Sequence, residues 1–133
     1  MIQMNSLIEL NNQKTIPCLG LGVYEMTLGT KTVETITYAL QKGYRHLDTA
    51  SLYNNESEVG EAVRASGLRR EDVFVTTKLW NSDHGYDSAL KAFEKSLNLM
   101  KFDYVEINIT EFFTHLEDNL QDTMKLSLIH ISE

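Results

Sequence analysis

Hydrophobic residues recur along this chain with two different periods, which predict short strands alternating with helices. Apolar runs typical of strands occupy 19–24, 44–48, 73–78 and 104–109. Between these runs, apolar residues recur every three or four positions, as on the buried face of a helix, over 30–42, 55–67 and 86–100. Asn55 lies three residues before Glu58, and this spacing predicts a capping box at the start of the second helix.

The first part of the chain predicts a β-hairpin. Residues 7–10 and 15–17 are two short strand-like runs, and the turn-forming residues 11–14 separate them. Pro17, the only proline, has no backbone N–H to donate, so it favours the edge of a sheet over a central strand.

The order of the predicted elements indicates an α/β fold. A hairpin followed by four strands that alternate with helices favours right-handed βαβ units and a parallel sheet. Four such units are half of a (β/α)8 TIM barrel, which typically needs about 250 residues. The prediction is therefore an incomplete (β/α)8 TIM barrel of about four βα units, preceded by an N-terminal β-hairpin. From Phe112 onward leucine and methionine recur at four-residue spacing, which indicates one amphipathic helix or a stretch without settled structure.

Composition narrows the classes of partner. The 133 residues carry a net charge of −7 and no run rich in lysine and arginine, so we expect no nucleic-acid partner. Cys18 is the only cysteine, which excludes an internal disulfide and fits a reducing compartment. No apolar run approaches the roughly 20 residues that cross a bilayer, and the first residues lack the features of a signal peptide. We expect a cytoplasmic protein with no membrane partner and no metal.

Three residues near the ends of predicted strands suggest proton chemistry. Asp48 ends one strand, Tyr53 lies in the loop after it, and Lys78 ends the next strand. In a parallel sheet these strand ends share one edge, so the three side chains are expected to meet. An ammonium bonded to a phenol favours the phenolate and lowers the tyrosine pKa, and a nearby carboxylate keeps the lysine charged. Such a tyrosine gives a proton to a developing alkoxide, while a cofactor supplies the hydride.

The spacing alone leaves a simpler alternative open. Asp48 caps a turn in that alternative, Tyr53 packs in its loop, and Lys78 is solvated, since charged residues are common at strand ends.

Two sequence runs resemble the aldo-keto reductase family. The first is GYRHLDTA at 43–50, continued by YNNE at 53–56 and VGEA at 59–62, and the second is FVTTKLW at 74–80. The resemblance extends over about residues 10–109. It implies an NADP(H)-dependent oxidoreductase that reduces aldehydes or ketones, a small-molecule carbonyl substrate, and a barrel closed at its bottom by an N-terminal hairpin.

The resemblance also implies roles for individual residues. Tyr53 would be the general acid, and Lys78 and Asp48 would tune it. Gly22, Val23 and Tyr24, together with Asp48, would lie beside the cofactor. Tyr24 and Trp80 would border the substrate.

The end of the chain departs from the family pattern. Glu111 occupies the position of a family histidine that orients the substrate carbonyl, and nothing after Ile109 matches. This predicts an N-terminal half barrel over 1–111 and a non-matching tail, helical or disordered, over 112–133. Strand edges left unpaired favour self-association. The alternative function is that of a non-catalytic truncated fragment, the product of a splice form, a pseudogene or a mispredicted gene.

Overall fold

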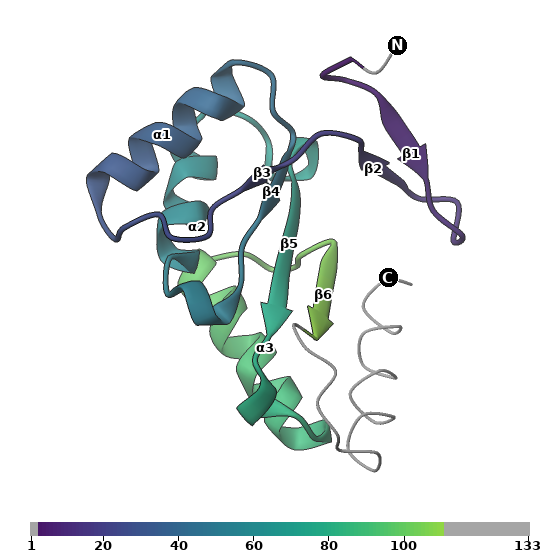
Figure 1. The fold of residues 1–133 in the computed structure, drawn as a ribbon, viewed down its shortest axis with the longest axis vertical. Coiled ribbons are helices and arrows are strands. Elements are labelled where there is room, and N and C mark those ends of the chain that lie inside the picture. The colour runs from purple at the N-terminus through teal and green to yellow at the C-terminus, as the bar shows by residue number, and fades with distance from the viewer. Residues whose placement is uncertain (1–2, 111–133) are drawn as a thin grey trace.

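A four-stranded parallel sheet forms the centre of the protein (Figure 1). The computed structural model describes the backbone of residues 3–110 and the side chains of residues 3–106. Within this part of the chain the strand order is β3-β4-β5-β6. The strands are β3 (Leu21–Gly22), β4 (His46–Asp48), β5 (Phe74–Leu79) and β6 (Ile107–Thr110). Strands that follow one another in the sequence are neighbours in the sheet and run parallel, as expected for consecutive βαβ units.

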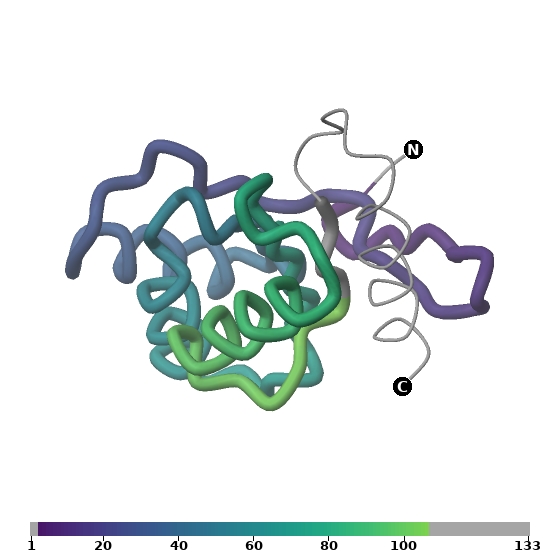
Figure 2. The backbone as a smooth tube through the Cα atoms, turned by 90° about the horizontal axis from the view of Figure 1, so that it is seen from below, coloured from purple at the N-terminus to yellow at the C-terminus, as the bar shows by residue number. Residues whose placement is uncertain are grey.

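Three helices connect the strands and lie along one face of the sheet (Figures 1 and 2). They are α1 (Thr30–Gln41), α2 (Glu56–Ala65) and α3 (Tyr86–Met100). Gly43 follows α1 with φ 107°, a left-handed conformation that glycine adopts without steric cost and that ends the helix. The alternation of strands and helices predicted from sequence is confirmed, and α3 has the bounds that its hydrophobic period predicts.

The predicted hairpin is also confirmed. Strands β1 (Leu7–Glu9) and β2 (Thr15–Pro17) pair antiparallel, with Leu7 opposite Pro17. They form a separate two-stranded sheet, and the hairpin extends away from the helices (Figure 2).

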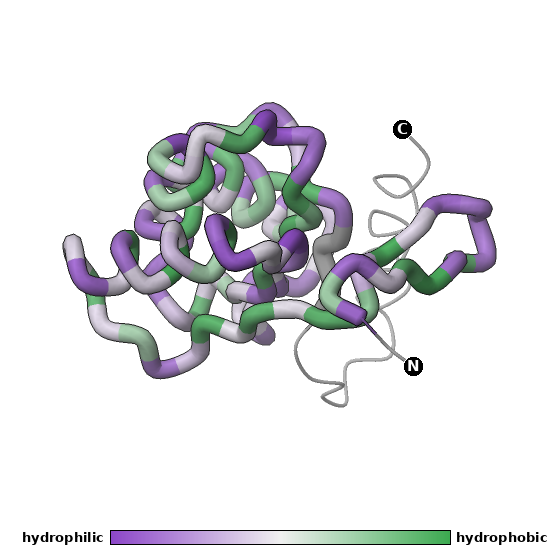
Figure 3. The backbone as a smooth tube through the Cα atoms, turned by 90° about the horizontal axis from the view of Figure 1, so that it is seen from above, coloured by the Kyte–Doolittle hydropathy of each residue, from purple (hydrophilic) through white to green (hydrophobic). Residues whose placement is uncertain are grey.

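The hydrophobic core lies between the sheet and the helices. Hydrophobic and hydrophilic residues alternate along the helices (Figure 3). The buried residues of each helix recur mostly at three- and four-residue steps, which places them on one side. Leu47 of β4 and Val75 of β5 are fully buried in one cluster with residues from all three helices. The largest fully buried helix members of that cluster are Ile36, Leu40, Val59, Val63 and Met100. This packing fixes how the strand ends are placed relative to one another.

The capping box predicted at the start of α2 is wrong. Asn55 is the N-cap residue of α2, but its side chain makes no capping hydrogen bond. The Glu58 carboxylate instead accepts a hydrogen bond from the backbone N–H of Gly29, at 3.0 Å. The Asn55 amide is drawn into tertiary hydrogen bonds, which compete with local capping.

The strands are shorter than, or shifted from, the predicted runs. β6 begins at Ile107 and not at 104, because the side chain of Glu106 takes the place of a backbone partner. Its Oε2 accepts the backbone N–H of Val75 at 2.7 Å and also pairs with Arg70 at 2.9 Å. Arg70 in turn stacks against the rings of Phe102 and Tyr104. The segment before β6 is therefore held mainly by side chains, with one backbone bond from the Glu106 N–H to the Val75 carbonyl at 3.1 Å.

Candidate active site

Two neighbouring strands and one short turn bring the predicted catalytic residues together. Asp48 is the last residue of β4 and pairs in register with Thr76 of β5. Lys78 lies two residues farther along β5, at the same edge of the sheet. Tyr53 ends a one-turn 3-10 helix, Ser51–Tyr53, that follows β4. The Ser51 hydroxyl donates to the carbonyl of Lys78 at 3.0 Å, so the turn is fastened to the strand that carries the lysine.

The ammonium of Lys78 has an acceptor for each of its three N–H groups. Nζ forms an ion pair with Asp48 Oδ1, donates to the carbonyl of Thr49 at 2.9 Å, and donates to the hydroxyl oxygen of Tyr53 at 3.2 Å. An ammonium has three donors and no acceptor, so these contacts use it fully. Because the Tyr53 oxygen accepts from Lys78, its own O–H proton remains free to point toward a ligand.

The charges of the cluster favour a protonated lysine. The Lys78 side chain is 12% exposed and that of Asp48 is 37% exposed. Burial lowers the pKa of Lys78, but the hydrogen bonds to Asp48 and Tyr53 outweigh it, so the pKa of Lys78 is raised. Lys78 therefore keeps a positive charge beside the Tyr53 hydroxyl across the physiological range of pH.

The residues predicted beside the cofactor differ in exposure. Gly22 is exposed, pairs with Asp48, and has nothing within 4 Å of where a Cβ would be. Tyr24 is 64% exposed, and its ring centroid lies 5.0 Å from that of Tyr53. Val23 is completely buried in the core, and its backbone N–H and C=O are both hydrogen bonded. Val23 therefore anchors Tyr24 without offering a surface of its own.

Trp80, predicted to border the substrate, directly follows β5 and is half-buried. It lies two residues beyond Lys78 at the start of the loop that leads to α3, and its carbonyl accepts from Asp83 at 3.0 Å. The structure thus places Trp80 at the end of β5 that carries Lys78. Glu111, at the family histidine position, lies outside the described residues, as does the predicted tail over 112–133.

Two residues that hold the cluster were missed by sequence reasoning. Thr49 supplies the third acceptor of Lys78 through its backbone carbonyl. Asn55 accepts from the Thr49 hydroxyl at 2.8 Å. The available signal was their position, since Thr49 directly follows Asp48 and Asn55 lies two residues after Tyr53.

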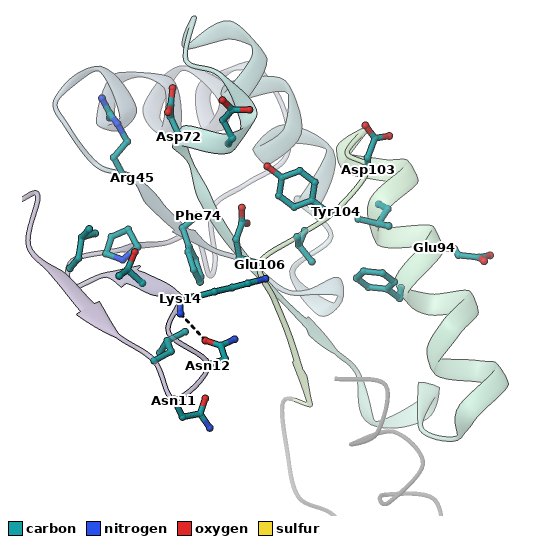
Figure 4. A pocket seen from close by; sticks show the side chains of 18 of the residues that line it. Asn11, Asn12, Lys14, Arg45, Asp72, Phe74, Glu94, Asp103, Tyr104 and Glu106 are labelled. Carbon is teal, nitrogen blue, oxygen red and sulfur yellow. Dashed lines mark hydrogen bonds between the residues drawn. The ribbon is translucent and has the colours of Figure 1, made fainter. Parts of the chain in front are cut away.

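A cavity of about 1080 Å³ lies away from this cluster (Figure 4). Its lining includes Lys14 of the hairpin, Phe74 at the start of β5, and Glu106 before β6. Asp48, Tyr53 and Lys78 do not line it. The cavity therefore belongs to the opposite ends of the strands, and we place the candidate active site at the exposed edge around Tyr53.

Neither a membrane span nor a metal cluster is found among residues 3–110. No helix in that part is long and apolar enough to cross a membrane. No group of three or more histidine, cysteine, aspartate or glutamate side chains there is arranged to hold a metal ion.

Comparisons with known proteins match this chain to one family. A sequence model described as "Aldo/keto reductase family" matches residues 19–125. An aldo-keto reductase of Mycolicibacterium smegmatis is 43% identical over 122 residues, which are 92% of this chain and 44% of that protein. The chain thus spans less than half the length of this relative.

Solved structures agree with the sequence match. The aldo/keto reductase from Brucella melitensis superposes with a TM-score of 0.88 at 42% identity, over 97% of this chain and 48% of that one. The aldo-keto reductase of Bombyx mori, solved in complex with NADP, has a TM-score of 0.77 at 30% identity, over 90% of this chain and 45% of its own.

Proposed function

Because this chain belongs to the aldo/keto reductase family, we propose that it serves in the NADP(H)-dependent reduction of aldehydes or ketones to alcohols, with Tyr53 as the proton donor. The observation that carries the proposal is the bond from Lys78 Nζ to the Tyr53 hydroxyl, at 3.2 Å, with Asp48 paired to the same ammonium. The proposed substrate is a small carbonyl compound.

We propose one role for each residue of the cluster. As the carbonyl oxygen gains negative charge, the Tyr53 hydroxyl donates its proton to it. The tyrosine oxygen that is left carries negative charge, and the ammonium of Lys78 already donates to that oxygen. Asp48 holds the ammonium in place through its ion pair. When bound, NADPH would supply the hydride that reaches the carbonyl carbon.

The residues beside Tyr53 fit the flat ring end of such a cofactor. The open space at Gly22 allows a ligand to approach the backbone closely. Tyr24, exposed and in ring contact with Tyr53, offers an aromatic face for stacking. Asp48 is partly exposed at the same edge. We propose Gly22, Tyr24 and Asp48 as cofactor contacts, with Val23 as their support, and Tyr24 and Trp80 as substrate contacts.

We propose that the four parallel strands over 1–111, with the hairpin before them, are one half of a (β/α)8 barrel. Three of the four units have their helix within the described residues, and the matched structures are about twice as long as the matched part. Residues 112–133 are the proposed non-matching tail. Self-association through strand edges would complete the sheet between two copies.

The proposal is tested by the rate of NADPH oxidation with an aromatic aldehyde, for the native chain, Tyr53→Phe and Lys78→Met. Loss of a positioned general acid costs about 10²- to 10⁴-fold, so both variants are expected to fall by at least about 100-fold. Tyr38→Phe is the matched control, because Tyr38 lies on α1 and is 61% exposed. Equal rates in the native chain, Tyr53→Phe and Lys78→Met would end the catalytic assignment.

The second candidate is a non-catalytic fragment. The length of the match favours this candidate, since the chain covers only 44% of the M. smegmatis relative and 48% of the Brucella protein. NADPH titration followed by fluorescence, together with size-exclusion chromatography, separates the candidates. Tight NADPH binding by a monomer contradicts the non-catalytic fragment. A specific activity (rate per mole of protein) that rises with protein concentration supports a dimer of two halves.

A further inference from the structure

Asn55 is a fully buried amide whose side chain joins two loops of the candidate active site. Its Oδ1 accepts from the Thr49 hydroxyl at 2.8 Å. Its Nδ2 donates to the carbonyl of Val23 at 2.9 Å and to that of Met26 at 3.4 Å. The amide therefore bridges the loop after β3 to the loop after β4, and it makes no bond to the N-terminus of its own helix.

Each end of this bridge leads to the proton donor. Thr49 is bonded to the oxygen of the amide. Its carbonyl accepts a hydrogen bond from the ammonium of Lys78, and its backbone N–H donates to β5. Val23, bonded to the nitrogen of the amide, precedes Tyr24, whose ring lies against Tyr53. The Val23 N–H also donates to the carbonyl of Asp48 at 3.0 Å.

We propose that Asn55 is a positioning residue for the proton donor: its amide fixes the Thr49 carbonyl that holds Lys78 and the turn that carries Tyr24 against Tyr53. The inference rests on the function proposed above. The side chain of Asn55 makes no hydrogen bond to Tyr53 or to Lys78, so it acts through Thr49 and Val23. Small displacements of a reacting group are costly, since a shift of about 1 Å can reduce the rate by about 10²-fold.

A purely structural role makes a different prediction. If Asn55 only filled the core, then any loss of a comparable buried hydrogen bond nearby would have the same effect. Thr77 offers that comparison, because its buried hydroxyl donates at 2.6 Å to Glu56, the residue after Asn55, and takes no part in the hydrogen bonds of the Lys78 ammonium. Thr49→Val and Thr77→Val are therefore matched variants, since each removes one buried hydroxyl and preserves shape.

The experiment measures geometry and rate separately. The protein is labelled with carbon-13 at the ζ carbon of tyrosine, and the Tyr53 resonance is assigned by its loss in Tyr53→Phe. Thr49→Val is expected to move this resonance and to lower kcat by about 10-fold, with the KM for NADPH within about 3-fold. Thr77→Val is expected to lower stability comparably and to leave the resonance and kcat near the native values.

Asn55→Asp extends the test, because it keeps the acceptor for Thr49 but loses both donors to the loop after β3. Asn54→Asp, at the exposed neighbouring position, controls for the added charge and is expected to leave the Tyr53 resonance in place. The inference is overturned if the two threonine variants behave alike, or if folded Asn55→Asp leaves the resonance unmoved. Should the native chain fail to oxidise NADPH, the proposed function falls, while the resonance shifts still decide the role of Asn55.

Discussion

The two single substitutions that break the Asp48–Lys78 ion pair are predicted to lower the free energy of unfolding by different amounts. Asp48→Asn leaves the ammonium of Lys78, whose side chain is only 12% exposed, without an anion. Loss of one partner from a fully buried pair costs about 3–5 kcal/mol, and the Asp48 side chain is 37% exposed, so this range is an upper bound for the present pair. Lys78 keeps the acceptors Thr49 and Tyr53, and the amide oxygen of the introduced asparagine can still accept, so we expect the lower end, about 3 kcal/mol, in the free energy of unfolding.

Lys78→Met is expected to lower the free energy of unfolding by less than Asp48→Asn does. The remaining carboxylate of Asp48 is 37% exposed and can be hydrated, and methionine fills the space of the lysine chain with apolar atoms. The principal loss is the hydrogen bond to the Thr49 carbonyl, worth about 1 kcal/mol. The double variant removes both charges, so its cost should be near that of Lys78→Met, well below the sum of about 4 kcal/mol for the two single changes.

Urea unfolding followed by circular dichroism measures these free energies, provided that the transition is two-state. The pH dependence gives a second check. In the native chain the pKa of Lys78 is raised, so its stabilising contribution is complete below the unfolded pKa of about 10.4 and is lost as pH rises through the folded value. In Asp48→Asn the stability is lost because the Lys78 cation has no anion beside it, and this loss disappears when the lysine deprotonates. The difference in free energy of unfolding between this variant and the native chain should therefore narrow as pH rises. A larger cost for Lys78→Met than for Asp48→Asn, or simple additivity in the double variant, would refute the reasoning.

Three further predictions concern the sheet and its helices. Burial raises the pKa of Glu56 despite its hydrogen bonds, so its contribution to stability is complete below about pH 4.5 and declines as pH rises through the folded value. Thermal melts of Glu56→Gln and the native chain should therefore diverge with rising pH, and a constant difference contradicts this. Gly60→Ala places a Cβ 2.0 Å from the backbone oxygen of Met100 and should lower the free energy of unfolding by about 2–3 kcal/mol. Glu61→Ala, at an exposed position of the same helix, should change it by less than about 0.5 kcal/mol. Equal effects of the two substitutions would contradict this prediction. Gly22→Ala should leave the melting temperature unchanged because nothing lies within 4 Å of its Cβ, but should weaken NADPH binding by about 10-fold in a fluorescence titration, and unaltered affinity would remove Gly22 from the site.

Helices and the hairpin were predictable because their signals are local. The apolar period over 86–100 and the turn residues between β1 and β2 act within a few positions of one another, so the sequence is enough to place them. Strand bounds were less predictable, since a strand exists only where a partner is aligned. β3 is reduced to Leu21–Gly22 because β4 pairs with those residues alone.

The candidate site was predictable in part for a similar reason. The strand order places the ends of β4 and β5 at one edge, which is sufficient to predict that Asp48, Tyr53 and Lys78 meet. The supports of the cluster depend on pairings between distant positions. Asn55 reaches Val23, 32 residues earlier, and this bond turns an apparent helix cap into a bridge between loops. Local spacing places Asn55 near Tyr53, but it carries no information about the bond to Val23.

The hydrogen bonds around Lys78 divide the work between the lysine and the tyrosine. The ammonium has three donors, and Asp48, Thr49 and Tyr53 occupy all of them. A direct bond from Lys78 to a substrate would break one of these contacts, so the lysine is suited to hold and polarise Tyr53 and not to touch the ligand. The hydroxyl proton of Tyr53 is then the one that this cluster can transfer. The three side chains and the bonds that place them all come from residues 22–78, so this arrangement is a property of β3, β4, β5 and their loops.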